Sequence, residues 1–132
     1  MRLYLVRHAK AAPGEPDALR KLTPAGEERA RELGQSLAAD GVRPAVILTS
    51  PLVRARQTAD ELGRALDTPV EVDERLAPGA TVDAVREAVA GRGETVMTVG
   101  HQPDCGMIAG ALTGGPPPDF PTAGVVAVEL DG

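Results

Sequence analysis

The chain has 132 residues, a length typical of one compact domain, and we expect residues 1–132 to form a single domain. Its net charge of −5 argues against a nucleic-acid partner held by a general basic field. No apolar run approaches the roughly 20 residues of a membrane span, so no membrane partner is expected. The single cysteine, Cys105, excludes an intramolecular disulfide, and we expect a cytoplasmic protein.

Short apolar runs alternate with helical patterns along the chain. In chain order, the expected elements are a strand over 2–6, a helix from Pro24 to just before Gly41, a strand over 45–48, a helix from Pro51 through Leu66, a strand over 69–72, a helix carrying Val82, Val85 and Val89, a strand over 94–99, a helix from near Pro103 through Leu112, and a strand over 124–130. This alternation predicts an α/β fold, a three-layer α/β/α arrangement with a mostly parallel central sheet.

Two helix starts have recognisable capping residues. Thr23 is the expected N-cap of the first helix, with Pro24 at its first position. Ser50 and Pro51 are expected to start the second helix in the same way. Backbone N–H groups at such a helix start form a ready anion site, and Arg54 would lie one turn further along.

Three polar segments directly follow predicted strands. Arg7 and His8 come after the first strand, residues 50–54 follow the second, and His101 follows the strand over 94–99. Ligands of open α/β sheets bind beyond the carboxyl ends of the strands. If these three strands are parallel, the three segments meet at one edge of the sheet.

The expected side-chain set suits a phosphoryl group. Arg7 and Arg54 offer two guanidinium groups, each able to hold two phosphate oxygens, and His8 and His101 complete the set. Taken singly, each of these residues has an ordinary structural explanation, but their joint placement after strands does not. Two histidines and one cysteine in no ligand spacing predict no metal site, and we expect no cofactor.

Three segments resemble motifs of the histidine phosphatase superfamily, which includes phosphoglycerate mutase. "LVRHAKA" (5–11) resembles its R-H-G signature, "TSPLVRARQTA" (49–59) its S-P-x-x-R-A-x-Q-T-A segment, and "VGHQP" (99–103) its second-histidine segment. "LTPAGEERA" (22–30) is similar to the family's first helix. The resemblance covers nearly the whole chain and implies a phosphoglycerate mutase-like fold without a large lid insertion.

The short chain, with "DERLAPGA" (73–80) and "FPTAGVVAVEL" (120–130), looks most like the small SixA-type phosphohistidine phosphatases. The resemblance implies that His8 is the nucleophile and forms a phosphohistidine intermediate. Arg7, Arg54 and His101 would then bind the phosphoryl oxygens.

Two positions depart from the family pattern. Ala9 replaces the usual glycine, and its methyl group is expected to narrow the pocket. Lys10 follows it, and either adds a substrate-binding charge or faces solvent. Neither departure removes a reacting atom.

The sequence also offers candidates for a general acid, the group that would protonate the leaving group. A phosphate ester leaves as an alkoxide and needs a proton, whereas phosphohistidine leaves as imidazole, whose conjugate acid has a pKa of roughly 6.5. Asp73 and Glu74 are the nearest candidates for an acid, with Glu74 preferred, although a charged solvated loop also explains them.

These observations predict a phosphatase acting on phosphohistidine in proteins. Two alternatives stay open, a phosphatase for small monoesters such as sugar or nucleotide phosphates, and a phosphate-binding regulatory module without turnover. The expected partner is accordingly a phosphorylated protein or a small phosphate ester, and the oligomeric state does not follow from the sequence.

Overall fold

A computed structural model describes residues 1–130 and contains one five-stranded sheet in the order β3-β2-β4-β1-β5. The strands are β1 (Arg2–Arg7), β2 (Val46–Thr49), β3 (Val70–Val72), β4 (Thr95–Gly100) and β5 (Val125–Glu129). The first four pair in parallel, and β5 runs antiparallel to β1 at the edge. The predicted mostly parallel sheet is confirmed.

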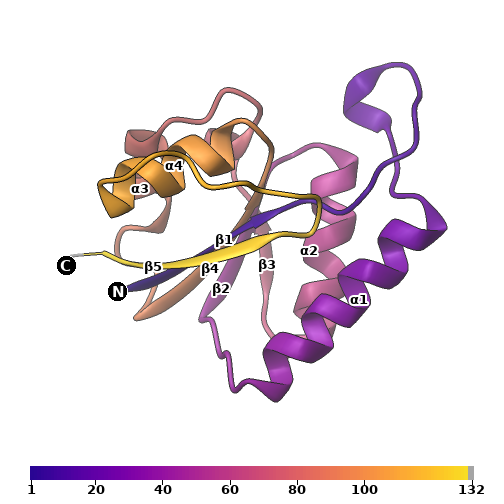
Figure 1. Cartoon of the computed structure of the whole chain (residues 1–132). Helices are drawn as coiled ribbons and strands as arrows, with labels where there is room; N and C mark the ends of the chain where they lie inside the picture. Colours follow the sequence, from indigo (N-terminus) through magenta and orange to yellow (C-terminus); the bar gives the residue numbers. More distant parts are fainter. Residues whose placement is uncertain (131–132) are drawn as a thin grey trace.

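Four helices cover the two faces of this sheet. Figure 1 shows α1 (Pro24–Ala39) and α2 (Val53–Leu66) on one side, and α3 (Val82–Val89) and α4 (Asp104–Thr113) on the other. Two short 3-10 helices, η1 (Asp17–Leu19) and η2 (Glu74–Leu76), lie in the connecting segments. The three-layer architecture without a large insertion is therefore confirmed. No helix within residues 1–130 has the length and apolar character needed to cross a membrane.

Each face of the sheet has its own hydrophobic core, because side chains alternate along a strand. Leu3 and Leu5 of β1 pack into the cluster beneath α3 and α4. Val6 of the same strand packs into the cluster beneath α1 and α2, which includes Leu33 and Leu62. Strand β1, which lies between β4 and β5, is thus fixed from both faces, and its carboxyl end is held in a defined position.

The start of α2 differs from the prediction. The helix begins at Val53, two residues after Pro51, and its N-cap is Leu52, without a side-chain capping bond. Ser50 is fully buried, and its Oγ accepts from the Leu52 N–H at 3.2 Å, so residues 50–52 form a turn before the helix. The predicted start at Pro51 is wrong, because the Ser50 hydroxyl closes this turn instead of capping the helix.

The start of α1 is as predicted and lies against the segment that follows β1. Thr23 caps the helix by accepting from the Gly26 N–H at 2.9 Å, and its own N–H donates to the Lys10 carbonyl at 3.0 Å. Gly26 approaches that carbonyl so closely that a Cβ at position 26 would lie 2.2 Å from the Lys10 oxygen. The backbone just beyond His8 therefore packs against the first turn of α1, at a position where only glycine fits.

Candidate functional site

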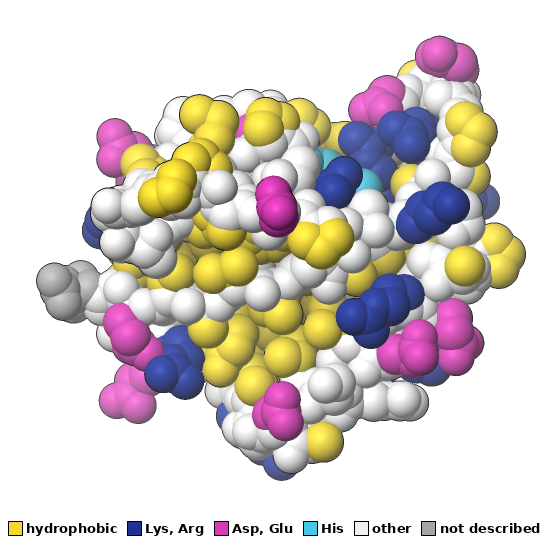
Figure 2. All heavy atoms as spheres, in the orientation of Figure 1, with side chains coloured by type: hydrophobic (Ala, Val, Ile, Leu, Met, Phe, Trp, Pro, Cys, Tyr) yellow, Lys and Arg dark blue, Asp and Glu magenta, His cyan; other side chains and the backbone are white. Residues whose placement is uncertain are grey.

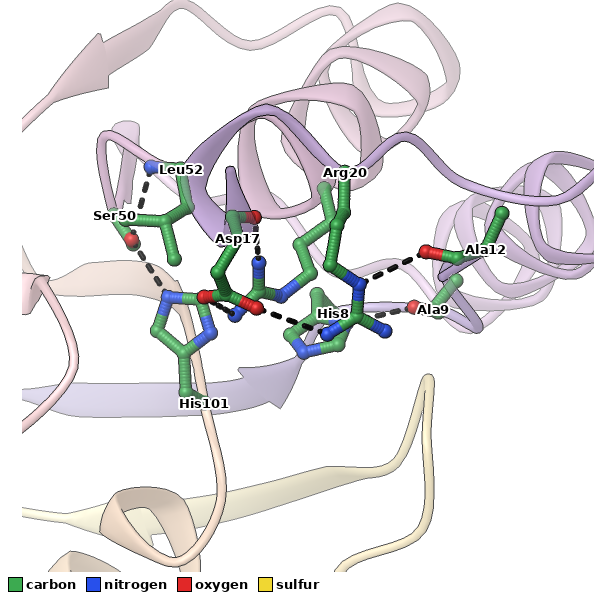
Figure 3. Close-up of polar contacts among 9 residues, drawn as sticks. His8, Ala9, Ala12, Asp17, Arg20, Ser50, Leu52 and His101 are labelled. Carbon is green, nitrogen blue, oxygen red and sulfur yellow. Dashed lines mark hydrogen bonds and ion pairs between the residues drawn. The ribbon is translucent and has the colours of Figure 1, made fainter. Parts of the chain in front are cut away.

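The two histidines meet because β1 and β4 are neighbours. Arg7 lies opposite Gly100 at the ends of these strands. The residues that directly follow the strands, His8 and His101, therefore lie side by side. Their ring centroids are 5.2 Å apart, with the planes tilted by 57° (Figure 3). The His8 N–H donates to the Gly100 carbonyl at 3.0 Å, and the His8 carbonyl accepts from Ala123 at 3.1 Å. Strand β4 and the segment before β5 thus fix the backbone of His8 on both sides.

The ring of His8 is held in one tautomer. Its Nδ1 lies 2.7 Å from the Ala9 carbonyl oxygen, which can only accept, so Nδ1 carries the proton and Nε2 presents a lone pair. Burial lowers the pKa of His8, and the nearby Arg54 and Arg7 charges lower it further. His8 is therefore neutral at physiological pH, with Nε2 available as a nucleophile.

Ala9 serves the packing beside His8. Its methyl group is completely buried in the cluster beneath α1 and α2. Its N–H donates to Thr58 Oγ1 at 3.0 Å, and the Thr58 hydroxyl donates to the Arg54 carbonyl at 2.9 Å. Helix α2 is thereby tied to the segment after β1, and Thr58 is a residue that the sequence analysis did not single out.

His101 is positioned by Ser50. Its Nε2 lies 2.7 Å from Ser50 Oγ, and both side chains are buried (Figure 3). Because the Leu52 N–H already donates to this oxygen, the Ser50 hydroxyl proton is free to donate to Nε2. With the Ser50 hydroxyl as the donor, the His101 proton lies on Nδ1. Burial lowers the pKa of His101 to about 4, with repulsion from a protonated His8 and from the Arg54 charge contributing in the same direction.

The two predicted arginines also lie at this edge of the sheet. Arg7 donates from Nη1 to the Phe120 carbonyl at 2.9 Å. Arg54 is 7% exposed, and its Nη1 donates to the Asp17 carbonyl at 2.9 Å. Both guanidinium groups contribute to lowering the pKa values of His8 and His101, so the structure brings the four predicted side chains together.

A third arginine, Arg20, belongs to the same group. It lies in a loop closed by an isolated bridge between Ala11 and Leu22, and its Nε donates to the Ala12 carbonyl at 2.9 Å. Its charge also lowers the pKa of His8. Neither Arg20 nor the neighbouring Asp17 is predicted from the sequence, because this polar stretch has no periodicity that would place them.

The other predicted residues have different surroundings. Lys10 is exposed, and no ion pair of its ammonium group occurs within residues 1–130. Asp73 is paired with Arg75, whose guanidinium holds the pKa of that carboxyl below its usual value. Glu74 is exposed at the start of η2. No hydrogen bond in the described part of the chain joins any of the three to His8 or His101, and their predicted roles remain predictions.

Two buried donors have no partner. Among the described residues, Arg7 Nε and His101 Nδ1 are the buried side-chain nitrogen and oxygen atoms without a hydrogen bond. An unpaired buried polar atom costs about 1–3 kcal/mol, so such atoms mark functional positions. In Figure 2 small parts of the histidine side chains are visible at the surface between basic side chains. Positive charge, unpaired donors and a neutral nucleophile together form a site for an oxyanion.

The chain is similar to known phosphatases over its whole length. The family described as "Histidine phosphatase superfamily (branch 1)" matches residues 3–78. Phosphohistidine phosphatase SixA of Escherichia coli (strain K12) is 32% identical, over 99% of this chain and 86% of that protein. A structure of the protein histidine phosphatase SixA complexed with tungstate has a TM-score of 0.91 and 31% identity, covering 99% and 89% of the two chains. A putative SixA from Agrobacterium tumefaciens has a TM-score of 0.83 and 33% identity, covering 96% and 89%.

Proposed function

Since the chain belongs to branch 1 of the histidine phosphatase superfamily, we propose that it removes the phosphoryl group from phosphohistidine in proteins, through a covalent intermediate on His8. His8 would be the nucleophile, and Arg7, Arg54 and His101 would bind the phosphoryl oxygens. The SixA relatives support this substrate, because the name of the curated relative is that of a phosphohistidine phosphatase and a related structure carries tungstate, an oxyanion.

The main support for this proposal is that two buried side-chain donors without partners lie beside the free Nε2 of His8. Arg7 Nε and His101 Nδ1 lack acceptors within residues 1–130, while His8 Nε2 has its lone pair available. Phosphoryl oxygens would supply the missing acceptors and bring the phosphorus atom to His8. A module that only bound phosphate would gain nothing from the fixed tautomer of His8.

The reaction follows in two steps. The His8 Nε2 lone pair forms a bond to phosphorus as the bond between phosphorus and the leaving group breaks, and the leaving group keeps that electron pair. Water then attacks phosphorus, the bond between phosphorus and His8 Nε2 breaks, and its electron pair returns to Nε2. The water protons leave with the inorganic phosphate, so His8 is again neutral. Charge stabilisation by the arginines supplies most of the catalysis, as in other phosphoryl transfers.

Neither Asp73 nor Asp17 is suited to protonate the alkoxide that an ester would release. Asp73 is engaged by Arg75, and Asp17 is engaged by Arg20 and Arg54, so the pKa of each carboxyl is lowered and both groups are ionised at neutral pH. An ester would need a proton for its alkoxide, and these two groups cannot supply it. Imidazole leaves without a strong acid, so a P–N substrate matches what the site offers.

The test compares kcat/KM for a phosphohistidine peptide with kcat/KM for a panel of phosphate monoesters. We expect fast turnover of the peptide, slow turnover of every ester, and loss of peptide turnover in His8→Ala by at least about a thousandfold, as for removal of other covalent nucleophiles. Glu74→Gln is the companion variant, and it should leave peptide turnover nearly unchanged.

A preferred ester, together with a large loss in Glu74→Gln, would identify a small-molecule phosphatase with Glu74 as its acid. Tight oxyanion binding without any His8-dependent turnover would identify the regulatory module instead. Either result would contradict the proposed function.

A further inference from the structure

We propose that the Asp17 carboxylate is a built-in competitor of the substrate: it occupies the anion position between Arg20 and Arg54, and the phosphoryl group must displace it. Arg20 then becomes a third arginine for the substrate. This inference deepens the proposed function and rests on it for the identity of the substrate, although the competition can be measured with an oxyanion alone.

The carboxylate bridges the two guanidinium groups as a phosphoryl group would. Asp17 Oδ1 accepts from Arg20 Nη1 at 3.0 Å, and Asp17 Oδ2 accepts from Arg54 Nη2 at 3.1 Å (Figure 3). Figure 3 shows the Asp17 carboxylate between the rings of His101 and His8, and the Asp17 charge raises the pKa of His101 while the Arg20 charge lowers that of His8. The bridged position therefore lies beside the two histidines, where the substrate's charge has to bind.

Neither arginine needs the carboxylate to stay in place. Arg20 is anchored through Nε to the Ala12 carbonyl, and Arg54 is anchored through Nη1 to the backbone carbonyl of Asp17. Each thus keeps a main-chain acceptor when the carboxylate leaves. The donors released, Arg20 Nη1 and Arg54 Nη2, are those that converge on one anion.

The carboxylate itself is easily displaced. The Asp17 side chain is 63% exposed, whereas the Arg54 side chain is 9% exposed. Asp17 belongs to η1, a three-residue helix without a buried residue, on a loop that projects from the body of the molecule (Figure 1). Water can solvate a released carboxylate, while the buried Arg54 charge requires an anion in its place. The exchange of Asp17 for a phosphoryl group is therefore favourable at Arg54.

The decisive variant is Asp17→Asn, which keeps the shape and removes the charge. We expect the dissociation constant of tungstate, measured by calorimetric titration of the whole chain, to fall by roughly three- to tenfold as the two ion pairs of Asp17 cease to compete. The KM for a phosphohistidine peptide should fall by a similar factor. Glu15→Gln is the matched control, because Glu15 is an exposed acid on the same loop without an ion pair within residues 1–130.

A second variant separates competition from general electrostatics. Arg20→Gln should weaken tungstate binding, and adding Asp17→Asn to it should restore less affinity than Asp17→Asn gives alone. Unchanged or weaker tungstate binding in Asp17→Asn would overturn the proposal, because Asp17 would then position the arginines. An equal gain in Glu15→Gln would overturn it as well. Because tungstate binding needs no turnover, these outcomes are distinct from a failure of the His8 chemistry.

Discussion

Burial lowers the pKa of His101 more than the charges around it do. It is 4% exposed, and the low dielectric around it is the largest cause of its low pKa. A neutral ring suits its place in the site, because its Nδ1–H can donate to an oxyanion while Ser50 holds Nε2. The same burial makes the stability of the fold depend on pH.

We predict that the free energy of unfolding falls as the pH falls from 6.5 to about 4. In this range the unfolded chain binds a proton at His101 that the folded chain does not, so acid favours unfolding. The difference between the ordinary pKa and about 4 corresponds to on the order of 3 kcal/mol. The pKa of His8 is also lowered, and it contributes in the same direction.

Urea unfolding across this pH range checks the prediction. The variant His101→Gln should show a clearly smaller pH dependence than the unmodified chain. Because the pKa values of Asp17 and Asp73 are lowered from 3.8, most of their own contribution is lost at and below the acid end of this window. The same pH dependence in both proteins would show that His101 is not the group responsible.

The individual site residues were predictable to different degrees. Arg7, His8 and His101 could be predicted because each lies next to an apolar strand, and the ends of parallel strands share one edge. Asp17 and Arg20 could not, because their places depend on how a loop folds back across the site. The role of Ser50 was misread, since its hydroxyl serves His101 and the Leu52 turn, which only the folded structure shows.

At the level of secondary structure, α1 has a positioning role beyond its packing. Its N-terminus docks on the Lys10 carbonyl, in the segment that continues from His8 and Ala9. The approach leaves no room for a side chain at Gly26. A substitution there displaces either the helix end or the backbone that fixes the His8 ring.

We predict that Gly26→Ala destabilises the fold and lowers activity. Alanine gains about 1 kcal/mol of helix propensity at most, but a Cβ placed 2.2 Å from a backbone oxygen forces the chain to move. Overpacking of this kind typically costs about 1–3 kcal/mol, so we expect a net loss of about 1–2 kcal/mol in urea unfolding.

The matched control is Gly115→Ala, where an added Cβ meets nothing within 4 Å. This variant should keep both its stability and its kcat/KM. Equal stability of the two variants would mean that the contact between Gly26 and Lys10 is readily relaxed, and that α1 does not constrain the segment after His8.

The boundaries of the elements followed from local patterns except at α2. Strand ends were predicted within one residue, because apolar runs end where turn residues begin. The start of α2 was misplaced by two residues, since the pattern of Ser50 and Pro51 fits both a cap and a turn. Local sequence cannot decide between the two, because the choice depends on His101, which is distant in the chain.

In the whole molecule, the sheet order assembles the site from distant parts of the chain. Strands β1 and β4 bring the two histidines together, and the segment before β5 returns to support them. From that segment Phe120 accepts from Arg7, and Ala123 donates to the His8 carbonyl. The alternation of strands and helices predicted the layers, but not the support from this last segment, because strand order and the return of a loop are not encoded in local periodicity.

The central claim is that His8 carries the phosphoryl group during turnover. The direct measurement is to mix the protein with a phosphohistidine peptide, quench within milliseconds in alkaline denaturant, and analyse its peptides by mass spectrometry. We expect one added phosphoryl group on the peptide containing His8, which forms and then decays as phosphate appears, and none in His8→Ala. Turnover of the substrate without any phosphorylated His8 peptide, or with the phosphoryl group on His101, would contradict it.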